Sequence, residues 1–240
     1  PALGALYAQA VARGDRDRIA LYAEQWDDWV TEHPKEGERV PTATWFWLAQ
    51  QYENAKKQEL AEKFYTRVVR GDDTKLRPFA QLGAGRAQLE QKRFANAVMS
   101  FDAYLAENPS MTNSPAVLMP LGRAQIGAAS WLAAATTAER LLALVPDGPG
   151  SAEARLLQAD AAAGSGNHAL AARLYGLLAT IVQDDPQVTP RALARAVECH
   201  RRAGNPAQAA EYEKQLQARF PNAPRPPGLT APPAPPKSGG

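Results

Sequence analysis

The sequence predicts an all-α protein built as a solenoid, in which short antiparallel pairs of helices stack one after another. Residues of the same kind recur every 36 to 41 positions along most of the chain, and a fixed period of about 20 to 50 residues is typical of repeat architectures. Within each period, two amphipathic stretches are separated by a short turn of polar or helix-breaking residues. We therefore expect about six helix–turn–helix repeats.

Two positions of the repeat hold small residues. Counted from the first residue of each repeat, position 20 is alanine six times out of six, and position 8 is small in all repeats but the last. Two helices approach closely only where the side chains between them are small, so these positions are expected to meet in each helical hairpin. Position 20 is Ala20, Ala61, Ala97, Ala134, Ala171 and Ala209, and position 8 is Ala8, Ala49, Gly85, Gly122, Ala159 and Val197.

Prolines and hydroxyl residues mark the helix starts. Pro78, Pro115 and Pro190 stand at position 1, where a missing N–H is harmless and the φ angle of proline already suits a helix. Ser114, Ser151 and Thr189 are the expected N-caps of three first helices. The predicted helices span residues 3–13, 15–32, 42–55, 59–70, 78–91, 94–107, 115–128, 130–145, 152–164, 168–183, 190–203 and 206–220.

The second repeat carries the signature of a known family. It has Trp45, Leu48, Ala49, Tyr52, Ala61, Tyr65 and Val68 where tetratricopeptide repeats have Trp, Leu, Gly, Tyr, Ala, Phe and Ala. The chain resembles this family over about residues 1–220. The resemblance implies a right-handed α-solenoid whose concave face, lined by the first helix of each repeat, binds a segment of a partner. Most of the repeats exceed the family period of about 34 residues, which places extra residues in the loops between repeats.

Composition separates two regions. We expect a solenoid over residues 1–221 and a proline-rich tail over 222–240, because the tail contains almost nothing that a core could bury. Five aromatic residues crowd the N-terminal end, where we expect them to pack in or cap the first repeats, with a partner-binding surface as the alternative. They are Trp26, Trp29, Trp45, Phe46 and Trp47.

Charge, cysteine content and the length of apolar runs argue against several classes of protein. The chain has 27 basic and 25 acidic residues, and the two signs are interspersed, whereas nucleic-acid binders gather their basic residues on one face. Its one cysteine, Cys199, permits no intramolecular disulfide. No apolar run approaches the length of about 18 residues that a membrane helix needs. We therefore expect neither nucleic-acid binding nor a membrane span; a removed signal or anchor segment stays open.

The sequence lacks the motifs of a catalytic or metal site. His33, His168 and His200 are scattered, and no histidine or cysteine pair has the spacing of metal ligands. A phosphate-binding loop and a nucleophile elbow are also missing from the sequence. We therefore expect a protein that is not an enzyme and that needs neither a cofactor nor a metal.

The resemblance also indicates which residues face a partner. Position 9 of the first helices, one of the groove positions of the family, carries two successive arginines, Arg86 and Arg123, followed by two acids. A guanidinium group can hold a carboxylate through two hydrogen bonds, so these arginines are expected to anchor an acidic or C-terminal group of an extended peptide. In the alternative, Arg123 pairs with Asp160 and the row is structural. The predicted binding residues are Phe46, Gln50, Phe79, Leu82, Arg86, Met119, Arg123, Asp160 and Glu198.

Together these features predict a scaffold that binds another protein or an extended peptide within a multiprotein assembly. The Lys/Asn clamp of the chaperone-binding members is missing, because positions 5 and 9 hold pairs such as Leu82 and Arg86. Residues 218–224 look similar to bacterial envelope members of the family, which points to the periplasm or the outer membrane. Two other functions stay open: self-assembly, for example as a homodimer, and a helical accessory domain of a larger enzyme.

Overall fold

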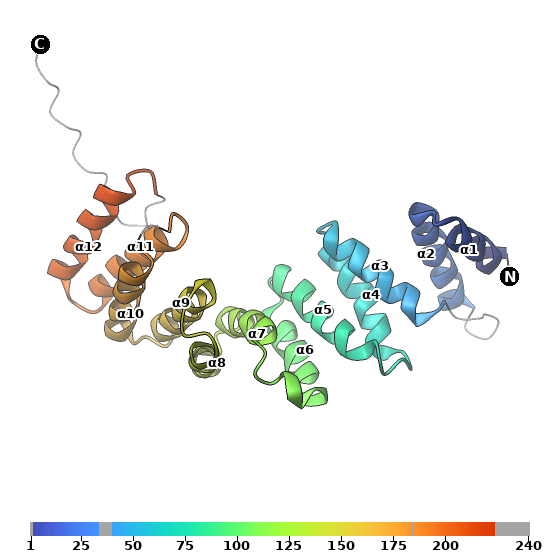
Figure 1. The fold of residues 1–240 in the computed structure, drawn as a ribbon, viewed down its shortest axis with the longest axis horizontal. Helices are drawn as coiled ribbons and strands as arrows, with labels where there is room; N and C mark the ends of the chain where they lie inside the picture. The colour runs from blue at the N-terminus through green and yellow to red at the C-terminus, as the bar shows by residue number, and fades with distance from the viewer. Residues whose placement is uncertain (1, 34–39, 184, 224–240) are drawn as a thin grey trace, which may run out of the picture. The chain divides into compact units, whose positions relative to one another are not determined.

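A computed structural model describes residues 2–33, 40–183 and 185–223. This part of the chain contains twelve α-helices, one short 3₁₀ helix and no strand, which Figure 1 shows in chain order. The predicted all-α fold is confirmed, and each helix begins and ends within three residues of its expected position. The helices are α1 (Ala2–Arg13), α2 (Arg16–Glu32), α3 (Thr42–Asn54), α4 (Gln58–Arg70), α5 (Arg77–Glu90), α6 (Phe94–Glu107), η1 (Pro109–Met111), α7 (Pro115–Gly127), α8 (Trp131–Leu144), α9 (Pro149–Gly164), α10 (His168–Ile181), α11 (Val188–Arg202) and α12 (Pro206–Arg219).

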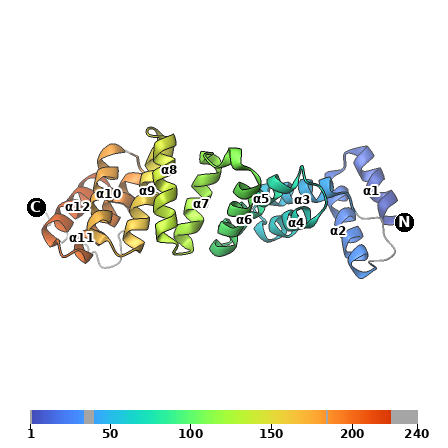
Figure 2. The same ribbon diagram turned by 90° about the horizontal axis from the view of Figure 1, so that it is seen from below.

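The helices gather into two compact units, residues 1–128 and 129–240. Unit 1 contains the pairs α1–α2, α3–α4 and α5–α6, with α7 packed against α6; unit 2 contains α8 packed against α9 and the pairs α9–α10 and α11–α12. The second helix of one pair also packs on the first helix of the next, as α4 does on α5 and α10 on α11, and Figures 1 and 2 show these helices side by side. The extent of the solenoid, 1–221, stays a prediction. The predicted tail lies outside the described residues from position 224 on.

Small residues lie at the helix crossings, as the sequence predicts. Ala49 and Ala61 of the α3–α4 pair are fully buried. In the next pair, a Cβ atom on Gly85 would lie 2.8 Å from the ring of Phe101. The same two positions are buried in the α9–α10 and α11–α12 pairs. At Gly85 even a single added methyl group would crowd Phe101, whereas the α11–α12 pair accommodates Val197 at the same position.

The first hairpin departs from this pattern. Ala8 is exposed and Ala20 only half-buried, whereas Ala10 and Ala23 are buried. The predicted repeat phase is therefore wrong by two or three residues in this hairpin. Its close contact lies elsewhere, since a Cβ atom on Gly4 would sit 3.3 Å from the indole ring of Trp26.

Two predicted N-caps are also wrong. Ser151 lies inside α9, where its hydroxyl donates to the carbonyl of Pro146 at 2.8 Å. Thr189 lies inside α11 and donates to the carbonyl of Val182. Helix α9 begins three residues and α11 two residues earlier than expected, so both hydroxyls lie within the first turn of a helix and bond back to the preceding segment. Ser114 does occupy the N-cap of α7, but its side chain makes no capping hydrogen bond.

Most of the N-terminal aromatic residues pack in the core, as predicted. Phe64 of α4 lies between two rings of α3: Trp45 stacks on it at a centroid distance of 5.4 Å and Tyr52 at 5.6 Å. Phe46 meets the edge of Tyr65 at 5.9 Å. These ring contacts hold α3 and α4 together in the repeat that carries the clearest signature.

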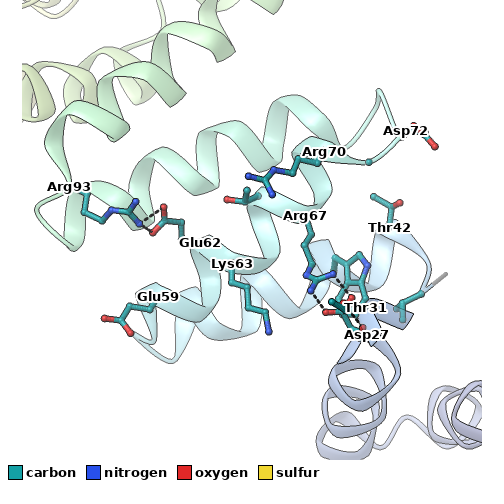
Figure 3. A pocket seen from close by; sticks show the side chains of 14 residues that line it. Asp27, Thr31, Thr42, Glu59, Glu62, Lys63, Arg67, Arg70, Asp72 and Arg93 are labelled. Carbon is teal, nitrogen blue, oxygen red and sulfur yellow. Dashed lines mark hydrogen bonds and ion pairs between the residues drawn. The ribbon is translucent and has the colours of Figure 1, made fainter. Parts of the chain in front are cut away.

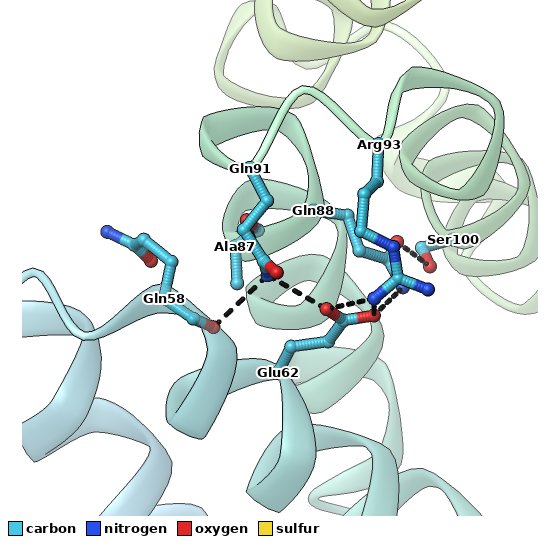
Figure 4. A network of polar contacts seen from close by, with 7 residues as sticks. All are labelled: Gln58, Glu62, Ala87, Gln88, Gln91, Arg93 and Ser100. Carbon is cyan, nitrogen blue, oxygen red and sulfur yellow. Dashed lines mark hydrogen bonds and ion pairs between the residues drawn. The ribbon is translucent and has the colours of Figure 1, made fainter.

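A buried carboxylate links α4 to the following pair of helices. Glu62, which is 9 % exposed, accepts hydrogen bonds from Gln88 at 3.0 Å, from Gln91 at 2.8 Å and from Arg93 at 2.6 and 2.7 Å. Ser100 of α6 in turn donates to Gln88 at 2.7 Å. Figure 4 shows these side chains converging on Glu62. A buried charge is tolerated when it is paired and hydrogen-bonded, so this network fixes how one repeat sits on the next.

We expect Ala97→Leu to lower the free energy of unfolding by about 1–3 kcal/mol, because added methylene groups overpack a close-packed core. Ala97 is fully buried on α6. Ala103 is exposed on the same helix, so Ala103→Leu is the matched control and should change stability by no more than about 0.5 kcal/mol. Urea denaturation followed by circular dichroism measures both. Equal effects of the two substitutions would contradict the assigned packing phase.

We expect Gly83→Ala to destabilise the protein as well. A Cβ atom at this position of α5 would lie 2.6 Å from the Tyr65 ring, which is only 1 % exposed and has no room to move. Overpacking costs about 1–3 kcal/mol, which outweighs the gain of about 1 kcal/mol in helix propensity. In a Tyr65→Leu background the cost should disappear. A double-mutant cycle of unfolding free energies measures this coupling, and additive effects would show that the two residues do not meet.

Candidate functional site

Seven of the nine predicted binding residues lie in unit 1, on the first helices α3, α5 and α7. Phe79 is the most exposed aromatic side chain among them, at 58 %. The others are exposed or half-buried, and none is a core residue. We call this set the first-helix face of unit 1; it consists of Phe46, Gln50, Phe79, Leu82, Arg86, Met119 and Arg123.

Arg86 is held in place by a carboxylate of the preceding repeat. Its Nε donates to Oε1 of Glu53 at 2.8 Å and its Nη2 donates to Oε2 at 3.2 Å, while the Tyr65 hydroxyl donates to Oε2 at 2.6 Å. Glu53 ends α3, Tyr65 lies on α4 and Arg86 on α5. Such two-point pairing restricts a guanidinium group to one orientation. Nη1 takes no part in the ion pair, and the Arg86 side chain is 44 % exposed.

The ion pair between Glu53 and Arg86 shifts the pKa values of the residues in this cluster. Burial alone would raise the pKa of the Glu53 carboxyl, but the hydrogen bonds from Arg86 and Tyr65 outweigh burial and lower it. Burial and the hydrogen bond to Glu53 raise the pKa of Tyr65. Hydrogen bonding to Glu53 likewise raises the pKa of Arg86. At neutral pH the cluster therefore consists of a carboxylate, a neutral phenol and a guanidinium cation.

A cleft of about 220 Å³ opens beside this cluster. Three successive repeats of unit 1 each contribute a cation to its lining: Lys56, Arg86 and Arg123. Lys56 stands in the turn after α3 with a positive φ of 60°. The cleft is small, and the charge of its Glu53 is already matched by Arg86. It is suited to a single carboxylate group. Its lining consists of Glu53, Lys56, Gln58, Arg86, Leu89, Glu90, Pro120 and Arg123.

The two predicted acids of unit 2 have local partners. Asp160 on α9 accepts a hydrogen bond from the Tyr175 hydroxyl of α10. Glu198 on α11 pairs with Arg195 at 3.0 Å and with Arg202 at 2.7 Å on the same helix. Both acids therefore make contacts within their own unit. The pairing of Arg123 with Asp160 stays a prediction.

A small apolar cleft of about 250 Å³ lies at the other end of α3. The hydroxyls of Tyr7 and Thr44 hydrogen-bond to each other, so the lining turns mainly carbon toward the opening. Trp47 forms part of this lining and is half-buried against the core that contains Trp45. The lining residues are Tyr7, Val11, Ile19, Ala43, Thr44 and Trp47.

A larger cleft of about 850 Å³ runs along the outer side of α4 and contains none of the predicted binding residues. Its lining includes four cationic and four acidic side chains. Arg67 is paired with the buried Asp27, and Arg93 is paired with the buried Glu62 at 2.6 Å; Figure 3 shows both pairs. Burial raises the pKa of Asp27 although Arg67 opposes the shift. With charges balanced in this way, the cleft favours neither anions nor cations.

The sequence analysis missed three residues of the site: Glu53, Lys56 and Tyr65. A signal for Glu53 was present, because position 12 is one of the groove positions of the family and Glu53 occupies it one repeat before Arg86. An acidic residue at position 12 of one repeat and a basic residue at position 9 of the next would indicate an ion pair such as that of Glu53 with Arg86. Lys56 gave no such signal, since it belongs to the turn.

Metal-binding geometry was sought among the described residues. No three histidine, cysteine, aspartate or glutamate side chains of residues 2–33, 40–183 and 185–223 lie together so that they could hold an ion.

Within the same ranges, no helix combines the length and the apolar character needed to cross a membrane.

Comparison with protein families identifies one repeat directly. Residues 79–110, which span α5 and α6, match the family model described as tetratricopeptide repeat. No curated protein matches the chain.

Solved structures share the fold at low sequence identity. MamA from Desulfovibrio magneticus RS-1, residues 41 to the end, has a TM-score of 0.62 at 16 % identity and covers 74 % of this chain and 93 % of its own. YrrB, described as a TPR protein with an unusual peptide-binding site, has a TM-score of 0.59 at 18 % identity, covering 83 % and 94 %. PilW, described as a widely conserved type IV pilus biogenesis factor, has a TM-score of 0.59 at 20 % identity, covering 91 % and 92 %. These likenesses establish a tetratricopeptide-type helical fold.

The Glu53 ion pair makes a prediction about pH. The folded-state pKa of Glu53 is lowered from its ordinary value of 4.5, so its stabilising effect is present above that pH and is lost as the pH falls through the lowered pKa. We expect Glu53→Gln to cost about 1 kcal/mol at pH 7, a charge-assisted hydrogen-bond contribution reduced by partial exposure. The difference from wild type should shrink steadily below pH 4.5. Urea denaturation between pH 3 and 7 measures it.

Glu90→Gln provides the control for this experiment, because Glu90 is an exposed carboxylate at the edge of the same cleft. It should leave stability almost unchanged at every pH. If Glu53→Gln costs as much at pH 3 as at pH 7, the ion pair does not stabilise the fold.

Proposed function

We propose that this tetratricopeptide-repeat protein is a non-catalytic scaffold, which binds an extended segment of another protein along the first-helix face of unit 1. The observation that carries the proposal is the Arg86 guanidinium, oriented by Glu53 and still 44 % exposed beside an open cleft. A charged group that is held in advance loses little conformational freedom when it binds a ligand.

Apolar surface beside the arginines supports the same proposal. Phe79, two turns before Arg86 on α5, exposes 58 % of its surface, and the half-buried Leu82 and Met119 belong to the same face. Exposed aromatic residues and arginines are enriched where protein partners bind. A segment with an acidic group and neighbouring apolar side chains would complement this surface.

The fold comparisons are compatible with this role. YrrB, which shares the fold, is described as having an unusual peptide-binding site, and PilW as a type IV pilus biogenesis factor. Together with the envelope-like segment 218–224, they favour a scaffold within a bacterial envelope assembly. This setting is part of the proposal.

The test compares capture by the wild type with capture by Arg86→Gln/Arg123→Gln in extracts of the source organism, quantified by mass spectrometry. We expect at least one protein to be captured by the wild type and reduced at least tenfold by the variant. Neutral glutamines are preferable to a charge reversal, because a glutamate at position 86 would face Glu53 and repel it. Circular dichroism and the melting temperature verify that the variant is folded.

The control variant is Lys75→Gln/Lys214→Gln, which removes the same charge at exposed positions that are not members of the first-helix face. It should capture the same proteins as the wild type. Capture that is lost equally in both variants would show that net charge alone matters. Capture that survives in both would place the binding surface elsewhere.

A further inference from the structure

Two clefts of complementary character lie at opposite ends of α3. The apolar cleft involves Ala43, Thr44 and Trp47 at the start of the helix. The cationic cleft involves Glu53 at its end. Both belong to unit 1, and between them Trp47, Gln50 and Asn54 share one face of α3, because residues three and four positions apart are neighbours on a helix. Gln50 and Asn54 are exposed, so this face is open from one cleft to the other.

The apolar cleft has the size of one side chain. Its volume of about 250 Å³ is below the range of about 300–1,000 Å³ that encloses drug-sized ligands, whereas a cavity of about 150 Å³ already accepts benzene. Its two hydroxyls, on Tyr7 and Thr44, are used by each other, so a polar group would find few partners there. The cleft therefore fits a large aliphatic or aromatic side chain.

The cationic cleft selects for an anion. Glu53 is engaged by Arg86 and Tyr65, so it repels an incoming carboxylate less than a free glutamate would. The exposed Glu90 adds a second negative charge, but the three cations of the lining outnumber the two carboxylates. Lys56 and the outer edge of Arg86 face the same opening. A carboxylate bound here would be held by charge-assisted hydrogen bonds, which are stronger than neutral ones.

Helix geometry sets the spacing between the two anchors. Thr44 and Glu53 are nine residues apart, which corresponds to about 14 Å along the axis at about 1.5 Å per residue. Nine residues also turn the helix by about 180°, so these two side chains leave α3 on opposite sides and about 14 Å is the minimum distance between the anchors. An extended chain advances about 3.3 Å per residue, so at least about four residues separate groups that reach both clefts. We infer that the partner segment is an extended peptide carrying one large apolar residue and, at least about four residues away, an aspartate or glutamate. This inference rests on the proposed function and specifies its ligand.

The test is a selection of random twelve-residue peptides displayed on phage, using the whole protein as bait. We expect the enriched sequences to share a large apolar residue and an acidic residue at a constant spacing of at least about four positions. The best peptide is then synthesised with a fluorescent label, alongside one version with the apolar residue replaced by alanine and another with Asp→Asn or Glu→Gln. Fluorescence anisotropy should show that each change weakens binding at least tenfold.

Protein variants then assign each anchor to its cleft. Binding to Trp47→Ala should be weak and no longer sensitive to the apolar change, yet still sensitive to the acidic change. Binding to Lys56→Gln/Arg86→Gln should also be weak, but it should be insensitive to the acidic change and still sensitive to the apolar change. Arg70→Gln, in the outer cleft along α4, should bind like the wild type. Circular dichroism verifies each fold.

The outcomes separate this inference from the proposed function. Peptides that lack the apolar–acidic pattern but still lose binding in Arg86→Gln/Arg123→Gln overturn this inference alone. If the selected peptides lose binding only to Arg70→Gln, both the inference and the proposed function are overturned, because the binding site is then the outer cleft. A selection without any saturable binder also overturns both.

Discussion

The close approach of paired helices at small side chains is the constraint on which the rest of the structure depends. Ala49 is buried in the α3–α4 pair, and Gly85 lies against Phe101 in the α5–α6 pair. These short side chains let the two helices of a hairpin pack closely, and the second helix then packs on the next repeat. The aromatic residues of α4 then fill the space between repeats, with Tyr65 lying directly over Gly83. Short side chains at a few positions thus allow long ones at others.

Unit 1 adds ionic links at two steps of this stack, between its first and second and between its second and third helical pairs. Asp27 of α2 pairs with Arg67 of α4, Glu53 of α3 with Arg86 of α5, and Glu62 of α4 with Arg93 in the turn before α6. In every case the acid comes from one repeat and the arginine from the next. Because breaking such a pair leaves a poorly solvated charge behind, these links oppose sliding of one repeat on another.

The same links decide which charges remain for a partner. On the outer side of α4, pairing with buried acids neutralises two arginines within a wide cleft that has equal numbers of both signs. On the first-helix face, by contrast, Glu53 orients Arg86 without covering it. The predicted arginine site is therefore a composite of three helices, in which Arg86 is both part of a structural ion pair and the proposed binding group.

The sequence by itself determined the helix order, the repeat period and the small residues at the crossings, because these follow from local spacing and steric size. The resemblance to the family, and not the helical period, pointed to the residues of the first-helix face. Local patterns failed in the first hairpin, where Ala10 and Ala23 replace Ala8 and Ala20. Only the tertiary structure decided that Glu53 and Tyr65 hold Arg86, and that Tyr7 and Trp47 enclose an apolar cleft. Those contacts join residues 12 to 40 positions apart, and their geometry depends on how the repeats stack.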